Sequence, residues 1–241
     1  MKRTILLFFI AASFYSCSKK SDGPEVQIPI EGTYISANSL EFKPIRMFTV
    51  NGEVQDVQVI ANFVSQKKLQ DYFRVQPGKV AQEIEFSVVV NADKSVEAKN
   101  GSEIIQASLT NYEGNIARVT GQVSENWIMS SGGTCLDKFN KLNLMRFDHL
   151  VDCRTISQST GFSRMCKSQK GFFIIVETEK RIYLPLQSYR LSNYTKFNDD
   201  YSECSYAASN EWNLVNPDHN KNLGSNDTLI VQEKRLMLNK K

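Results

Sequence analysis

Four short segments between residues 84 and 123 are predicted strands, and the first of them places apolar residues at every second position. They are 84–90, 96–98, 104–109 and 116–123. A period of two is typical of strands that bury one face, and turn signals such as Asn100-Gly101 separate the segments. Short strands at regular spacing predict an antiparallel β meander, barrel-like or a sandwich, and therefore a mainly β protein.

One helix is predicted, near residues 56–74. Apolar residues recur there at helical spacing, at positions 57, 60, 61 and 64, and Asp56 is placed to serve as the N-cap. A strand over residues 54–60 is the competing interpretation, because Val57 and Val59 also alternate with polar residues. Pro77-Gly78 is expected to close the segment.

The second half of the chain has a less regular pattern. Strands are predicted at 142–147, 149–156, 172–176, 181–186 and 228–238, and long polar loops at 157–170 and 192–227. Residues 172–176 are continuously apolar, which predicts a strand buried on both faces. No internal repeat is visible, so residues 30–241 are expected to form a single β-rich domain.

The N-terminal sequence has the pattern of an export signal. Lys2 and Arg3 precede an apolar stretch at 5–15, which is too short to cross a bilayer as a helix of about 20 residues. Residues 1–16 are therefore predicted to be a signal peptide. Residues 17–29 are rich in Ser, Lys, Gly and Pro and are predicted to be a flexible tether.

Ser16-Cys17, followed by this polar tether, resembles the lipobox of bacterial lipoproteins. Phe14 and Tyr15 depart from its usual Leu and small residue. The segments 30–36, 46–63 and 227–241 resemble uncharacterised lipoproteins of Bacteroidetes. The resemblance implies lipidation of Cys17 and anchoring to the outer membrane. The tether lacks the acidic run of a surface-export signal, which implies that the protein faces the periplasm.

A second, fainter resemblance lies at the start of the predicted domain. The sequence Glu-Gly-Thr-Tyr at 31–34 leads into the meander as the first strand of lipocalin-like barrels does. Tyr34 stands where lipocalins place a Trp, and the helix near 56–74 comes earlier than the C-terminal helix of that fold. This resemblance implies a barrel with a ligand cavity.

Four cysteines remain after Cys17 is assigned to lipidation. Cys135, Cys153, Cys166 and Cys204 form an even set, and disulfides persist in the oxidising compartments to which exported proteins go. They are disulfide candidates in any of three pairings, and buried free thiols are the alternative. Their spacings contain no C-x-x-C, so a zinc site is not expected.

Charge and motifs argue against two functional classes. The net charge of +3 falls to about +1 without Lys2 and Arg3, so no nucleic-acid partner is expected. No nucleophile, phosphate-loop or metalloprotease motif is present. His149 is expected to be a strand residue and His219 a solvated loop residue. We therefore predict no catalytic residue, metal or cofactor, and an enzyme is less expected than a non-enzyme.

Aromatic residues crowd the region between 183 and 212, interleaved with Asn, Asp and Ser. The candidates for ligand contact are Tyr183, Tyr189, Tyr194, Tyr201, Tyr206 and Trp212. Exposed rings beside polar groups stack on sugars and other flat ligands, although the same rings can simply cover a core. The leading hypothesis is a binding module for a small ligand or glycan. The alternative is a structural subunit that docks another envelope protein.

Overall fold

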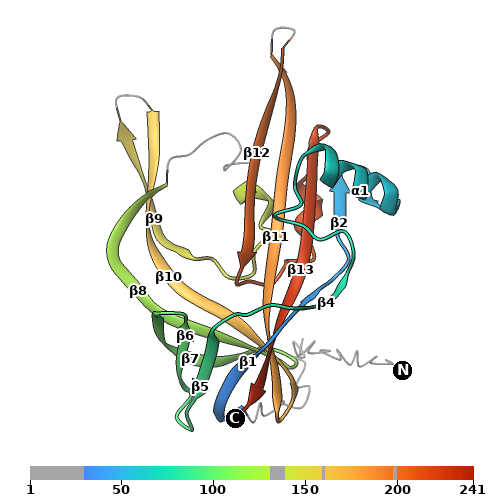
Figure 1. The fold of residues 1–241 in the computed structure, drawn as a ribbon. Coiled ribbons are helices and arrows are strands. Elements are labelled where there is room, and N and C mark those ends of the chain that lie inside the picture. Colours follow the sequence, from blue (N-terminus) through green and yellow to red (C-terminus); the bar gives the residue numbers. More distant parts are fainter. Residues whose placement is uncertain (1–29, 131–138, 159–160, 198–199) are drawn as a thin grey trace, which may run out of the picture.

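The computed structural model describes residues 30–130, 139–158, 161–197 and 200–241. Eight antiparallel strands close into a barrel (Figure 1). They are β1 (Gly32–Phe42), β5 (Phe86–Val90), β6 (Ser95–Asn100), β7 (Glu103–Glu113), β8 (Ile116–Ser130), β10 (Gly161–Thr178), β11 (Arg181–Phe197) and β13 (Asp227–Lys240). Strand β13 pairs with both β11 and β1, which closes the ring.

The remaining elements are insertions between barrel strands. They are β2 (Arg46–Thr49), β3 (Gly52–Val54), α1 (Val57–Gln66), β4 (Gly78–Ala81), β9 (Leu150–Gln158), β12 (Asp200–Glu211) and the short 3₁₀ helix η1 (His219–Asn222). β9 extends the sheet beside β10, and β12 extends it beside β11. In Figure 1, β8, β9 and β10 curve away on one side, while β11, β12 and β13 rise on the other.

Apolar side chains from all eight barrel strands fill the barrel interior. Tyr34, Val88, Ile174 and Leu236 are among its fully buried members. Burial of such side chains is the main favourable term in folding. The prediction of a mainly β, barrel-like meander is confirmed. The apolar side chains inside the barrel form a packed core.

The predicted helix begins where expected and ends earlier. Asp56 is its N-cap, accepting hydrogen bonds from the backbone N–H groups of Gln58 and Val59. The helix ends at Gln66 instead of near residue 74, because Lys68 adopts a left-handed conformation with φ of 51°. The following turn still buries Leu69, which packs with the helix against β13.

The continuous apolar run in β10 is buried on both faces, as predicted. Phe172 and Ile174 face the barrel interior, whereas Phe173 points outward and packs against Tyr112 at a ring-centroid distance of 4.9 Å. Phe147 covers the same outward ring at 6.4 Å.

Three predictions in the second half are wrong. Residues 142–147 are not a strand: residues 139–142 are helical and an irregular segment follows. The loops expected at 157–170 and 192–227 are largely strands, because β9, β10, β11 and β12 extend through them. Backbone pairing holds these hairpins together, and their polar side chains carry no alternating apolar pattern. No described helix has the length and apolar character needed to cross a membrane.

Candidate functional site

The site begins where two barrel strands separate. β10 and β11 pair only beside the hairpin that joins them, and the pair farthest from this turn is Ile175 with Tyr183. Beyond it, segment 139–149 lies between the two strands (Figure 1). Its Phe147 packs on β10 as described above, and its Phe139 stacks on Tyr189 of β11 with ring centroids 4.7 Å apart.

A second segment, 213–216, holds segment 139–149 in place. The Asn213 side chain, which is 1% exposed, accepts a hydrogen bond from the Phe147 N–H at 3.0 Å and donates one to the Phe147 carbonyl at 2.8 Å. Met145 forms a β-bridge with Val215. The buried side-chain amide of Asn213 therefore satisfies the backbone N–H and carbonyl of Phe147, as a neighbouring strand would.

The first cavity, with a volume of about 430 Å³, lies beside this segment. Aromatic rings form part of its wall: Phe139 lies 4.6 Å from Tyr206 and 4.7 Å from Tyr189, centroid to centroid. Asn140 and Asn143 add amide groups. A volume of this size and a mixed aromatic and polar lining are typical of small-molecule sites.

The second cavity, of about 320 Å³, lies at the edge of the barrel core. Its apolar lining includes Phe86, Phe172 and Trp212, and the Trp212 ring lies 4.7 Å from that of Phe86. Lys170 and Glu103 also line it and form an ion pair with each other. The cavity therefore combines an apolar surface with a polar edge.

His149 and Glu211 line both cavities, so the two cavities adjoin. The His149 carbonyl accepts a hydrogen bond from the Gln169 N–H at 2.9 Å, and its Nδ1 lies 3.2 Å from the Gln169 carbonyl. A carbonyl only accepts, so this contact assigns the proton to Nδ1. Glu211 is held through the β-ladder opposite Gln187.

The electrostatics of the first cavity favour some ligands over others. Two carboxylates line it, those of Asp148 and Glu211, and no Lys or Arg is among its described lining residues. Burial raises the pKa of Tyr189, and the neighbouring Tyr206 and Glu211 raise it further, so this phenol stays neutral. Hydroxyl-bearing or positively charged groups therefore suit the cavity better than anions.

The structure brings some of the predicted ligand-contact residues together. Tyr189 and Tyr206 line the first cavity and Trp212 the second. Tyr183 does not join them: it is buried elsewhere, and its hydroxyl donates to Glu177 at 3.0 Å. The Tyr194 and Tyr201 side chains lie outside the described part of the chain.

Sequence reasoning missed the other walls of the site. Phe147 fell in a predicted strand, Phe139 was assigned to no element, and Glu211 fell in an expected loop. His149 was treated as an ordinary strand residue. Only the clustering of Asn and aromatic residues around Tyr206 pointed towards this region.

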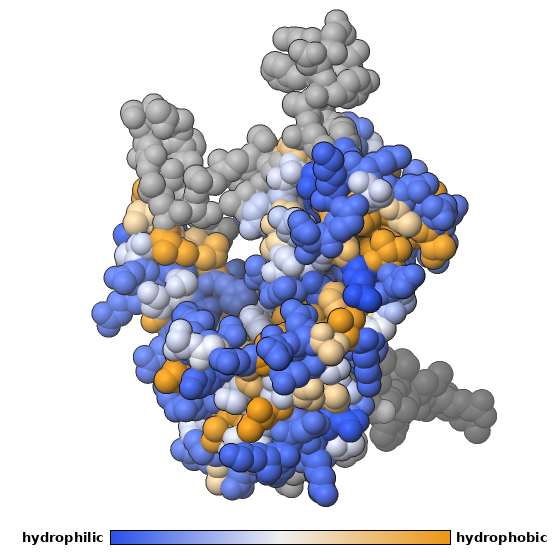
Figure 2. Space-filling view, in the orientation of Figure 1, coloured by the Kyte–Doolittle hydropathy of each residue, from blue (hydrophilic) through white to orange (hydrophobic). Residues whose placement is uncertain are grey.

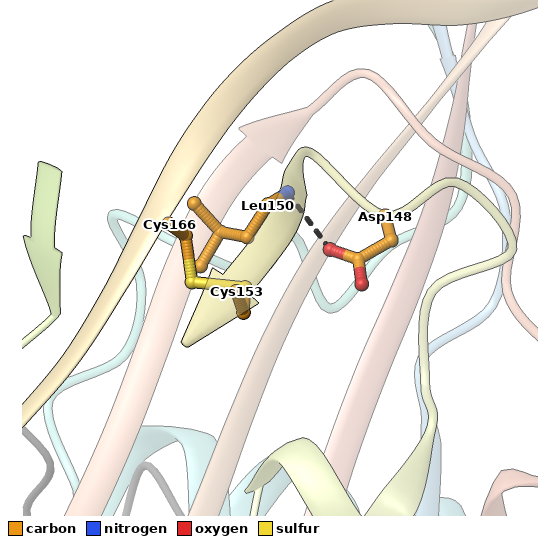
Figure 3. The surroundings of a disulfide bond; sticks show 4 residues. All are labelled: Asp148, Leu150, Cys153 and Cys166. Carbon is orange, nitrogen blue, oxygen red and sulfur yellow. Dashed lines mark hydrogen bonds between the residues drawn. A yellow bond between two sulfur atoms is a disulfide. The ribbon is translucent and has the colours of Figure 1, made fainter. Parts of the chain in front are cut away.

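A disulfide lies directly after the site segment. Cys153 of β9 and Cys166 of β10 are bonded, with Cα atoms 4.1 Å apart (Figure 3). In the same view, Asp148 turns back to accept a hydrogen bond from the Leu150 N–H at 2.8 Å. Cys204 is also disulfide-bonded, whereas Cys135 lies outside the described residues. The disulfide prediction is thus confirmed for Cys153 and Cys166.

His219 is not solvated as predicted. It is 1% exposed, packs edge-on against Phe48 at 4.6 Å, and its Nδ1 donates to the Asn216 carbonyl. Burial lowers its pKa, and its Nε2 has no hydrogen-bond partner in the described structure. Across the described ranges, no group of three or more His, Cys, Asp or Glu residues is arranged to hold a metal ion.

Comparison with known proteins gives no relative: no protein-family model, curated protein or solved structure matches this chain.

Proposed function

We propose that this chain is a binding module whose ligand occupies the two adjoining cavities beside segment 139–149 and the end of β12. The observation that carries the proposal is that His149 and Glu211 line both cavities, so the two cavities share part of their walls, and aromatic rings line each of them. The proposal includes no catalytic step, metal or cofactor.

The ligand class follows from the lining. The rings of Phe139, Tyr189 and Tyr206 offer flat apolar surfaces, and Asn140 and Asn143 offer amide donors and acceptors. Sugars present this combination of apolar faces and hydroxyl groups. The Trp212 cavity suits an apolar substituent. A small glycan, or a small molecule that joins a hydroxylated and an apolar part, is the ligand that fits best.

We further propose that the module is lipid-anchored through Cys17 in the cell envelope, on the periplasmic side of the outer membrane. The signal-like segment 1–16 and the Ser16-Cys17 junction support the anchor. The Cys153–Cys166 disulfide supports an oxidising compartment. Protease treatment of intact cells tests the orientation: digestion without lysis would contradict a periplasmic protein.

The binding proposal is tested on protein extracted gently from its native membrane. Native mass spectrometry should show an excess of a few hundred daltons that disappears on denaturation. Tyr206→Ala and Trp212→Ala should each lose this excess. Tyr72→Ala is the matched control, because Tyr72 is also a half-buried ring but packs in the cluster around α1. Retention of the ligand in both site variants would overturn the proposed site.

The alternative is an interaction subunit that docks another envelope protein. Its support is that α1 leaves Val57 77% exposed and Val59 45% exposed. Figure 2 shows hydrophobic residues in separate patches divided by hydrophilic ones on the face it presents, instead of one continuous apolar surface. In the same experiment, a native mass with a second protein chain and no small ligand would favour this alternative.

A further inference from the structure

Lys234 of β13 is a buried cation near the proposed site. Its residue is 3% exposed, it pairs with Leu186 of β11, and the core residues Leu236 and Leu238 share its face of the strand. Its Nζ lies 5.2 Å from the centroid of the Phe42 ring. Such a residue needs hydrogen-bond acceptors, because an unpaired buried charge is costly.

Two neutral oxygens satisfy this amine. Lys234 Nζ donates to Ser188 Oγ and to Asn210 Oδ1, both at 2.7 Å. Neither of these acceptors is a carboxylate. Burial alone lowers the pKa of Lys234, to about 8. The lysine therefore connects β11 with the end of β12 and forms no ion pair with either.

Asn210 stands at an irregularity in the ladder between β11 and β12. Gln187 pairs with Glu211 and Tyr189 pairs with Ala208, so two residues of β12 face Ser188 alone. Asn210 has a φ of 58°, in the left-handed region. This arrangement is a β-bulge, and bulges re-aim the side chains that follow them.

The residues that follow this bulge belong to the proposed site. Glu211 lines both cavities, and Trp212 lines the second one. Without the bulge, a regular ladder would shift the residues beyond it by one position and turn each side chain to the opposite face of the sheet. The bulge therefore sets the face of the ladder on which Glu211 lies and the direction in which the chain leaves β12 towards Trp212.

We propose that Lys234 is a positioning residue for the binding site, holding Asn210 in the bulge so that Glu211 and Trp212 face the cavities. The expected effect of Lys234 on ligand binding rests on the proposed function. The positioning itself is a property of the unliganded protein. The two are therefore measured separately.

The test uses Trp212 as a reporter. The chain has two tryptophans, so Trp127→Phe leaves Trp212 as the only one. In this background, Lys234→Met keeps a long apolar side chain and removes the donors. We expect a red shift of the Trp212 emission, a higher acrylamide quenching constant and loss of the bound ligand in native mass spectrometry. Unchanged emission and quenching would overturn the proposal.

A second variant keeps the proposal testable if Lys234→Met fails to fold. Asn210→Gly removes the acceptor, while glycine adopts the same positive φ without strain. It should shift the Trp212 emission in the same direction, and the double variant should show no further change, because both substitutions break one contact. Additive shifts would contradict a shared role. Altered emission with the ligand retained would contradict the proposed site and leave the positioning role intact.

Discussion

The ring of Phe147 lies directly against the backbone of Gly171. A Cβ atom added to Gly171 would stand 2.3 Å from Phe147 Cζ and 2.7 Å from the Val119 carbonyl oxygen, closer than atoms pack. Glycine is required here by this close approach, which seats the site segment on β10.

Gly171→Ala should therefore displace Phe147 and the cavity wall that follows it. We expect a loss of about 1–3 kcal/mol in the free energy of unfolding, the usual cost of overpacking. Urea denaturation measures the loss. Phe147→Leu in the same background should recover part of it, since the smaller side chain relieves the clash with the ring. Wild-type stability in Gly171→Ala would contradict the close packing.

The Cys153–Cys166 disulfide should stabilise the start of β9. The bond closes a loop of 13 residues, for which the chain-entropy model gives up to about 3 kcal/mol. The double variant Cys153→Ala, Cys166→Ala should lower the urea midpoint and weaken ligand retention, because Asp148 and His149 lie just before the bond. A midpoint equal to that of wild type would show that the β9–β10 ladder alone holds the segment.

His219 should make the protein less stable in mild acid. Burial lowers its pKa below the ordinary value of 6.5, so the unfolded chain binds a proton more readily than the folded one. This contribution to stability is present above pH 6.5 and is lost as the pH falls below it. The His219→Asn variant keeps a donor for the Asn216 carbonyl and does not titrate. Urea midpoints from pH 7 to pH 5 should fall less for this variant, and parallel curves would contradict the prediction.

Lys234 should produce a trend of the same sign at higher pH, with stability again rising as the pH rises. Its pKa falls from 10.5 to about 8 in the folded protein, so the unfolded chain binds more protons between these values. Stability should therefore rise with pH from about 8 upward on account of this group, up to pH 10, where the tyrosines begin to ionise. Lys234→Met should lack the rise. Unfolding curves at pH 7, 8 and 9 decide between these outcomes, and an equal rise in both proteins would contradict a buried, desolvated amine.

The meander was predictable because its evidence is local. Phe86 and Val88 alternate with the polar residues Glu85 and Ser87, and the partner strand follows after a short turn, so the pattern alone indicates strand, turn and buried face. The N-cap at Asp56 was predictable for the same reason, since its side chain bonds the backbone of its own helix.

The candidate site was predictable only in part, because it depends on contacts between distant segments. Asn213 replaces a strand partner for Phe147, which lies 66 residues away, and no local pattern signals that bond. The β11–β12 hairpin is polar on its outer part, so its sequence resembles a loop although its two strands pair with each other along most of their length. The tyrosines near 189 and 206 were noticed for their composition, and the fold supplied Phe139 and His149 to complete the site.

The closing strand also constrains how the chain folds. Tyr34 of β1 pairs with Lys240 of β13, so the ring is completed by contacts between residues near the two ends of the domain. β13 also contributes Leu236 and Leu238 to the core. Topologies dominated by such distant contacts fold slowly, because loop closure precedes the gain from contact. The barrel therefore cannot close until β13 is present to pair with both β1 and β11, and until then these two strands keep open edges.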